Sequence, residues 1–202
     1  MFYEAAKGHG LPHDPLKAIV APRPIGWISS RSAEGALNLA PYSFFNALSS
    51  KPMLVWFSSE GEKDSVTFIR QTGEFVANLV TLDLADKMNA TSVDAPRGTS
   101  EFGYAGLTPA PSRLVAAPRV AEAHAALECR VTEIRRPTLL DGSEAGVTVV
   151  TGQVIGVHID DACLIDGLFD SAKAQNLARL GYMDYAAVER VFRMRRPRWE
   201  KG

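Results

Sequence analysis

The chain has 202 residues, of which 46% are hydrophobic. This is enough to build the core of one folded domain, and it argues against a largely disordered chain. A formal net charge of -1 gives no overall attraction for nucleic acid or for an anionic membrane surface. No apolar run approaches the roughly 20 residues of a membrane helix, and the first residues lack the pattern of a secretory signal. We therefore expect a soluble, cytoplasmic protein that binds neither nucleic acid nor membrane.

The two ends of the chain differ in character from the middle. Residues 1–17 are rich in His, Gly and Pro without a periodic pattern, so we expect an N-terminal arm. Residues 195–202 form a basic C-terminal tail, which we expect to be solvated, with nucleic-acid contact as the alternative. The folded domain is expected over residues 18–194. Its cysteines, Cys129 and Cys163, lie in apolar contexts, which predicts two buried thiols, with a disulfide as the alternative.

Short apolar runs separated by turn residues dominate the first half of the domain, a pattern typical of β-strands. Strands are expected at residues 25–31, 36–39, 53–58 and 75–80, and residues 41–49 are expected to form a segment rich in hydroxyls and amides. A helix is expected to begin near Lys63, with Asp64 as its cap and Gly73 at its end. A short amphipathic helix is expected at residues 82–91.

The second half of the domain begins with residues 94–111, a long irregular segment of the kind that often serves as a lid or an interface. The longest strands are expected at residues 125–134 and 147–159, which are rich in Val, Ile and Thr. Residues 185–194 fit a final strand or a terminal helix. At least six strands with short connections predict a mainly β protein, an antiparallel barrel with a few appended short helices.

Nucleophilic catalysis finds little support in the sequence, because there is no GxSxG motif and there are only four histidines. We therefore assign hydrogen-bonding roles to five hydroxyls: Ser29, Ser30, Ser43, Ser49 and Ser58. His124 and His158 lie in strand-like surroundings and are expected to be structural, with a functional role as the alternative for His158. The neighbouring carboxylates Asp160 and Asp161 lack a histidine at metal-binding spacing, so no metal site is expected.

The most specific local motif is Lys63-Asp64-Ser65. A lysine before a helix, a hydroxyl in the first turn and free backbone N–H groups together favour a phosphate. An ordinary capped helix is the alternative. The hydroxyls and amides of residues 23–59 favour the phosphate site over the ordinary capped helix. A phosphorylated, planar cofactor with neutral edges would contact these groups as well as Lys63-Asp64-Ser65.

Three stretches of the sequence carry a family resemblance: RPIGWISSRSAEGALNLAPYSFFNALSSKPMLVWFSS, then KDSVTFIRQTGEFVANLV, then PRVAEAHAALECRV. Together they resemble the flavin reductase-like domain family of FMN-binding split barrels, over about residues 22–161. The resemblance implies a six-stranded antiparallel split barrel that forms a homodimer. It also implies one FMN per subunit, bound at the dimer interface.

The resemblance further implies which residues contact the cofactor. The end of the first strand would lie against the FMN phosphate and ribityl chain, and Lys63 to Ser65 would lie near the same phosphate. Residues 43–49 would line the edge of the isoalloxazine ring. Trp27 fits either the core, which we favour, or a place beside the flavin. The implied cofactor-binding set is Trp27, Ile28, Ser29, Ser30, Arg31, Ser43, Asn46, Ala47, Ser49, Ser58, Lys63, Asp64 and Ser65.

The activity implied by the resemblance is electron transfer from NADH or NADPH through FMN to free flavin, a protein or a small acceptor. No catalytic residue is assigned, because the flavin carries the chemistry. Many NADH-dependent members have Gly-Asp-His before the penultimate strand, where this chain has residues 144–147 without a histidine. This departure favours the flavoredoxin-like branch. The alternative function is therefore an FMN electron carrier without NAD(P)H activity of its own.

Overall fold

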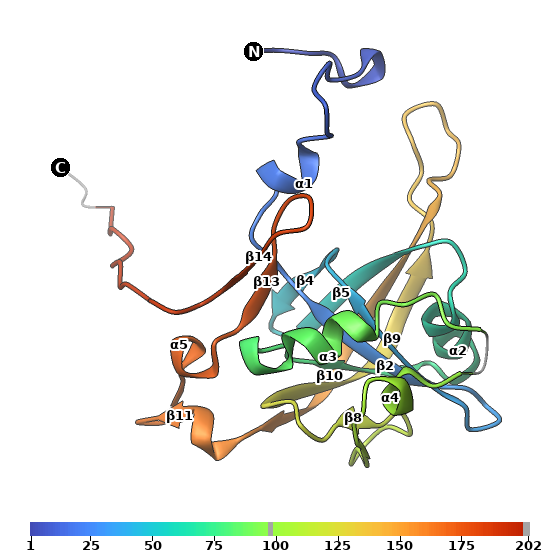
Figure 1. The fold of residues 1–202 in the computed structure, drawn as a ribbon, viewed down its shortest axis with the longest axis vertical. Coiled ribbons are helices and arrows are strands. Elements are labelled where there is room, and N and C mark those ends of the chain that lie inside the picture. Colours follow the sequence, from blue (N-terminus) through green and yellow to red (C-terminus); the bar gives the residue numbers. More distant parts are fainter. Residues whose placement is uncertain (97–98, 200–202) are drawn as a thin grey trace.

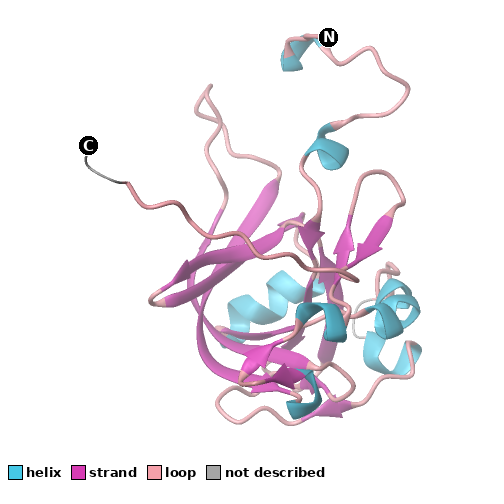
Figure 2. Cartoon of the chain, turned by 90° about the vertical axis from the view of Figure 1, so that its left-hand side faces the viewer, coloured by secondary structure: helices cyan, strands magenta, loops and turns pink. Residues whose placement is uncertain are grey.

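The computed structural model describes residues 1–96 and 99–199. Its principal strands are β2 (Gly26–Arg31), β3 (Leu37–Tyr42), β4 (Phe45–Ser50), β5 (Met53–Glu60), β6 (Glu74–Asn78), β9 (Ala125–Arg135) and β10 (Val147–Ile159). They form a seven-stranded antiparallel sheet in the order β3-β2-β6-β9-β10-β5-β4. The sheet curls into an open, barrel-like wall (Figures 1 and 2). The predicted mainly β, antiparallel split barrel is therefore confirmed, with one strand more than expected.

Shorter elements surround this sheet. The small strands are β1 (Arg23–Pro24), β7 (Pro109–Ala110), β8 (Arg119–Val120), β11 (Leu164–Ile165), β12 (Leu168–Phe169), β13 (Leu177–Arg179) and β14 (Tyr185–Ala187). The helices are α1 (Leu16–Ile19), α2 (Asp64–Thr72), α3 (Ala85–Ala90), α4 (Glu101–Tyr104) and α5 (Ser171–Ala174), with 3-10 turns at Ala5–Lys7, Leu82–Leu84 and Asp161–Cys163. No helix in the described part of the chain is long and apolar enough to cross a membrane.

The additional strand is β4, which occupies most of residues 41–49, the segment expected to be rich in hydroxyls and amides and not assigned to a strand. It pairs with β5, with Phe45 opposite Phe57 and Ser50 opposite Met53. β4 lies at the edge of the sheet, and most of its side chains are exposed. A strand with one open edge and little burial carries no clean apolar alternation, so its sequence pattern is weak.

The sheet separates two main clusters of buried side chains, because successive residues of a strand point to opposite faces. Ile28 packs inside the curled sheet with Phe57 and Phe75. Trp27 packs on the opposite face with Leu39 and other apolar side chains, including those of α3 and α4. The indole Nε1 of Trp27 donates a hydrogen bond of 2.8 Å to Thr91 Oγ1. Trp27 is thus a core residue, which was the favoured interpretation.

With Asp64 as its cap, helix α2 would begin at Ser65, but it begins one residue earlier, at Asp64. Lys63 has the extended backbone of an N-cap residue, and Asp64 is already the first helical residue. The prediction that Asp64 caps this helix is therefore wrong. The helix ends at Gly73, as expected, because Gly73 has the left-handed backbone that closes many helices. The buried face of α2 includes Val66 and Ile69, which belong to the core inside the curled sheet.

Other segments refine the expectations from the sequence. Residues 82–91 form a 3-10 turn followed by α3, and the segment 94–111 contains α4 and β7, with residues 97 and 98 outside the described residues. After β14 the chain is irregular as far as residue 199, so the strand was the correct alternative for residues 185–194, although it covers only their start. The last three residues of the predicted basic tail lie outside the described residues.

The two cysteines are buried and free, as the sequence predicts. Burial raises the pKa of the Cys129 thiol to about 12, with Glu128 adding to the effect. This thiol is therefore protonated at neutral pH and acts as a small apolar side chain of the core.

Gly152 of β10 shows how closely the core is packed. A Cβ at this position would lie 2.5 Å from Phe75 Cε1 and 3.2 Å from Cys129 Cβ. Because both neighbours are fully buried, Gly152→Ala is expected to lower the free energy of unfolding by about 1–3 kcal/mol, measured by urea denaturation. Gly103→Ala is the control, since its Cβ would meet nothing within 4 Å. Equal losses for the two variants would contradict the packing argument.

Candidate functional site

Two adjoining cavities lie beside β3 and the start of α2. The first has a volume of about 430 Å³ and is lined by Asn38, Ala40, Pro41, Tyr42, Lys63, Asp64, Ser65, residues 91–95 and Glu101. The second has about 310 Å³ and is lined by Ile25, Pro41, Ser43, Met88, Asn89, Ser92, Arg179, Met183 and Tyr185. They share Pro41 and Ser92, so we treat them as one elongated site and call it the α2 groove.

The end of the α2 groove at the helix start is rich in hydrogen-bond donors. Asn38 Nδ2 donates to Ser65 Oγ over 2.7 Å, which leaves the Ser65 hydroxyl proton for a second acceptor. Ser30 faces Asn38 across β2 and β3, and its buried hydroxyl has no partner among the described residues. The first backbone N–H groups of a helix have no helical carbonyl to bind and carry a partial positive charge. Together with Lys63, these groups favour an anion.

Carboxylates line the same end and limit this preference. Lys63 Nζ lies 3.8 Å from Asp94 Oδ1, in an exposed ion pair. The buried carboxylate of Glu101 accepts the N–H of Leu39 over 2.9 Å. Burial raises the pKa of Glu101 in spite of this hydrogen bond, and the nearby charge of Asp64 also raises it. The carboxylates of Asp94 and Glu101 thus limit how strongly this end of the groove favours an anion.

The other end of the α2 groove is flatter and less polar. Met88 belongs to the buried cluster beneath it, and the Arg179 guanidinium lies 4.3 Å from the centroid of the Tyr185 ring. Ser43 contributes a hydroxyl at this end. An aromatic and apolar surface with a few polar groups is typical of sites for planar ligands.

The structure brings together only part of the predicted cofactor-binding set. Lys63, Asp64 and Ser65 line the first cavity, and Ser43 lines the second. Ser30 lies beside them through its pairing with Asn38. These residues come from β2, the turn after β3 and the start of α2, so the two regions singled out in the sequence do meet.

The remaining predicted residues lie outside the α2 groove. Trp27 and Ile28 are core side chains, and Ser29 is buried, where it donates to the Pro118 carbonyl and accepts from Asn78. Arg31 is exposed and lines a separate cavity with Gly35. The others lie on β4 and β5 and line none of the described cavities: Asn46, Ala47, Ser49 and Ser58. Trp27 and Ile28 are neighbours on β2, so their side chains point to opposite faces of the sheet and pack in different clusters.

Several groove residues were missed at the sequence level. Asn38 had a detectable signal, since it is a single amide within the apolar run Ala36 to Ala40. Glu101 and Arg179 had none, because their positions depend on long-range folding of α4 and β13. The part of the groove that Glu101 and Arg179 line can therefore be identified only from the folded structure.

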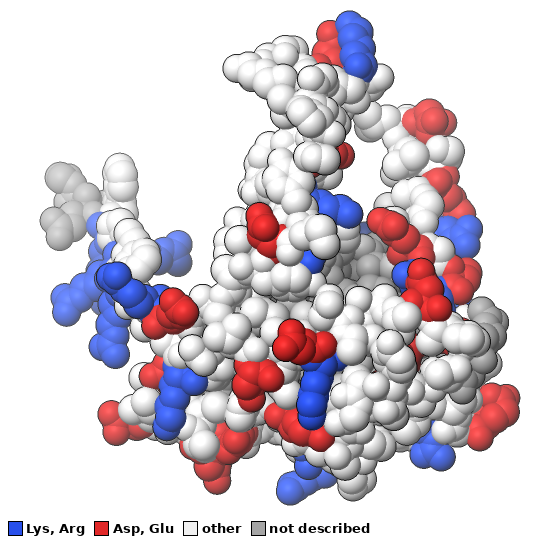
Figure 3. Space-filling model, viewed as in Figure 1, with Lys and Arg blue, Asp and Glu red and all other residues white. Residues whose placement is uncertain are grey.

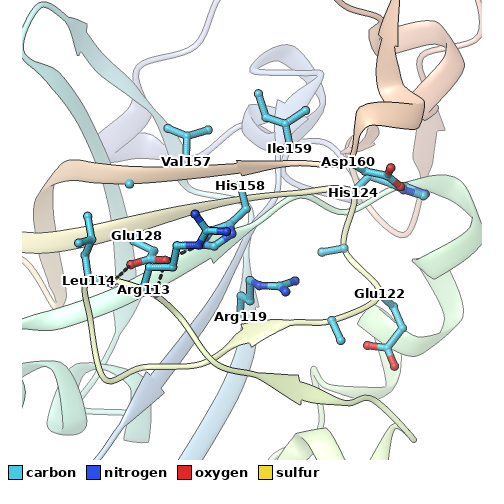
Figure 4. A pocket seen from close by; sticks show the side chains of 13 residues that line it. Arg113, Leu114, Arg119, Glu122, His124, Glu128, Val157, His158, Ile159 and Asp160 are labelled. Atoms are coloured by element: carbon cyan, nitrogen blue, oxygen red, sulfur yellow. Dashed lines mark hydrogen bonds and ion pairs between the residues drawn. The ribbon is translucent and has the colours of Figure 1, made fainter.

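A third cavity of about 530 Å³ is lined by His124 and His158, the two histidines whose roles the sequence analysis considered (Figure 4). The buried Glu128 carboxylate accepts the N–H groups of Arg113 and Leu114, over 2.8 and 2.6 Å, and contacts His158 Nε2. Burial raises the pKa of Glu128, but the hydrogen bonds from Arg113, His158 and Leu114 outweigh this, and the net pKa is lowered. Glu128 thereby holds the loop at Arg113 and Leu114 against the sheet.

His124 has a comparable partner. Its Nδ1 lies 3.0 Å from Asp160 Oδ2, and Asp160 also accepts the N–H of Ala162. Both histidines are thus engaged with carboxylates that anchor backbone, which agrees with the structural roles expected for them. The α2 groove is the better candidate for ligand binding, because it combines the start of a helix with the lysine and hydroxyl of Lys63 and Ser65.

Comparison with known proteins relates the chain to a family. The model of the flavin reductase like domain matches residues 20–175. A protein of uncharacterized function from Halalkalibacterium halodurans is 33% identical over 90% of this chain and 89% of its own length. Among solved structures, component B of nitrilotriacetate monooxygenase from Bacillus cereus has a TM-score of 0.83 and 26% identity, covering 93% of this chain and 100% of that one.

A second solved structure, the 2-nitrobenzoate 2-nitroreductase of Pseudomonas fluorescens, has a TM-score of 0.79 and 27% identity, covering 90% of this chain and 88% of that one. The likeness therefore extends over the whole barrel and its appended elements, well beyond the stretches that carry the sequence resemblance. Because the family match spans most of its length, the chain belongs to the flavin reductase-like domain family.

Proposed function

We propose that the chain binds FMN in the α2 groove and acts as an oxidoreductase, passing electrons from NADH or NADPH through the flavin to free flavin or another acceptor. The observation that supports this most is that the two ends of the groove differ in chemical character. The chain's membership of the flavin reductase-like domain family supports it as well. A donor-rich helix start lies at one end, and the other end mixes apolar side chains and one tyrosine with hydroxyl and amide groups. FMN would supply the acceptance and release of electrons, and the protein would bind and orient it.

The residues present fit such a cofactor. Lys63, Ser65 and the first N–H groups of α2 would hold the phosphate, because α2 is nine residues long and its start faces the cavity. The orphaned hydroxyl of Ser30, next to Asn38, is a further donor close to this end. Ser43 and the surface around Tyr185 would contact the planar ring. No side chain is required as an acid or base in this assignment.

We also propose that the protein is a homodimer. Asn46 and Ala47 are predicted to contact the ring, yet they lie on the exposed edge strand β4, outside the α2 groove of their own chain. In a two-fold dimer, each subunit can present the same surface to its partner. We assign these two residues to the cofactor of the second copy.

The visible spectrum of the purified protein tests flavin binding, and anaerobic mixing with NADH or NADPH tests the activity. We expect a flavin spectrum and bleaching within seconds at millimolar donor. Bound FMN that neither donor reduces would establish the electron carrier instead. Colourless protein that fails to quench the fluorescence of added FMN would contradict both functions.

A further inference from the structure

The C-terminal arm, defined here as residues 189–199, leaves the body of the protein as an irregular extended chain (Figure 1). Its large apolar side chains are open to solvent, with exposed fractions of 66% for Val191, 84% for Phe192 and Met194, and 91% for Trp199. Phe192 and Met194 alternate with Arg193 and Arg195, which is the period of a β-strand with one apolar face. Several exposed apolar residues on one segment indicate a surface that another molecule covers.

The arm begins beside an apolar cavity. The N–H of Val188 donates to the Asn176 carbonyl over 2.9 Å, and Asn176 and Leu177 line a cavity of about 290 Å³. Most of the remaining lining is apolar and includes Phe45, Leu127, Val157, Ile159 and Phe169. We call this cavity the β10 groove. Its lining matches the apolar face of the arm in chemical character.

One edge of β10 is open at the β10 groove. β10 pairs with β9 as far as Ile159, but with β5 only as far as Gln153. Within the described chain, no strand pairs with the other edge of residues 154–159. The apolar side chains of Val157 and Ile159 are partly exposed there. An open edge with apolar residues is a template for an added strand.

Charge supports the same match. The arm carries five arginines and one glutamate. Residues 160–170, which follow directly from β10 and include Phe169, carry four aspartates and no lysine or arginine. In Figure 3 a group of basic side chains lies on the arm, away from the body, and several acidic side chains with a basic one among them lie at the lower left, where Figure 1 places β11. Opposite charges of this kind favour association and orientation.

We propose that the arm of one copy docks on the β10 groove of a second copy and adds a strand to the open edge of β10. Phe192 and Met194 would enter the groove, and the arginines would face residues 160–170. A second copy fits better than the arm's own body, because the arm begins at the rim of its own groove and then leaves it. With a two-fold axis beside the groove, the arm of each copy would reach the β10 groove of the other copy, and both contacts would belong to one symmetric interface.

Disulfide trapping between two differently tagged chains tests this directly. One chain carries Met194→Cys or Phe192→Cys and the other carries Ile159→Cys, and the two are co-expressed and oxidised. We expect a cross-linked heterodimer for at least one of the two arm positions, at least tenfold above the wild-type pair, because residues 192 and 194 share a strand face. Arg193→Cys is the matched control for the opposite face. Leu140→Cys, fully exposed on a distant hairpin, replaces Ile159→Cys as the second control.

Cross-links no more frequent than in the two controls would overturn the proposal. So would a cross-link that forms only when both cysteines are in the same chain, which would place the arm on its own groove. The trapping experiment needs no flavin, so its outcome is independent of the test for FMN binding.

A second measurement uses no introduced cysteine. Phe192→Asp with Met194→Asp is expected to raise the dimer dissociation constant at least tenfold, measured by analytical ultracentrifugation, because two aspartates cannot enter an apolar groove. The matched control Arg193→Asp leaves the apolar face intact and is expected to raise it less. Unchanged dissociation in the double variant, with its circular dichroism preserved, would contradict the docking.

Discussion

Replacement of Glu128 by alanine is expected to lower the free energy of unfolding by about 2–5 kcal/mol, because each buried donor left without an acceptor costs about 1–3 kcal/mol. The Glu128 side chain is almost completely buried and satisfies three donors: the N–H groups of Arg113 and Leu114, and His158 Nε2. Alanine leaves all three without their acceptor, and the loop at Arg113 loses its attachment to β9. Urea denaturation at neutral pH measures the loss.

The pH dependence gives this prediction a second readout. Because the folded-state pKa of Glu128 lies below its ordinary value of about 4.3, the stabilisation is complete above that value and is lost as the pH falls through the folded-state pKa. The stability difference between wild type and Glu128→Ala should therefore shrink in acid. Glu128→Gln is the control, since it keeps an oxygen acceptor and should lose less. A loss below about 1 kcal/mol for alanine would show that the loop is held by other contacts.

The double substitution Lys63→Ala with Ser65→Ala is expected to weaken FMN binding about 100-fold or more. Hydrogen bonds to a charged group contribute about 1.5–3 kcal/mol each, and both side chains line the end of the α2 groove assigned to the phosphate. Riboflavin lacks the phosphate, so its affinity should change little. Titration of flavin fluorescence with each variant gives both dissociation constants.

Lys51→Ala is the matched control for the lost positive charge. Lys51 is exposed in the turn between β4 and β5 and lines none of the described cavities. It should leave both affinities unchanged. Equal losses of FMN and riboflavin in the double variant would show that the phosphate lies elsewhere.

Much of the barrel could be predicted because its inner strands carry strong local patterns. β9 and β10 are long runs rich in β-branched and apolar residues, and both were located within a residue or two. Gly73 marked the end of α2 for a local reason, its left-handed backbone. β4 could not be located in this way, because an exposed edge strand is held by its pairing with β5 and not by burial.

The candidate site was predictable only in part. Lys63 and Ser65 form a local motif at a helix start and could be found from sequence spacing. The polar run at Ser29 to Arg31 suggested that all three residues contact the cofactor. They do not line one site, because alternate side chains of β2 enter different environments. The contact between Glu128 and His158 joins residues 30 positions apart through the pairing of β9 and β10, and neither residue carries a local signal for it.

The tryptophans of the chain provide an optical consequence of its exposed arm. Trp27 is completely buried and Trp56 is half-buried in β5, whereas Trp199 is almost fully exposed. Indole emission moves to shorter wavelength when the ring passes from water to an apolar surface, so Trp199, the most exposed of the three, has the largest change to make. The docking proposed for the arm is therefore expected to shift this emission to shorter wavelength as the protein concentration rises, and a chain ending at Val188, which lacks Trp199, gives the baseline.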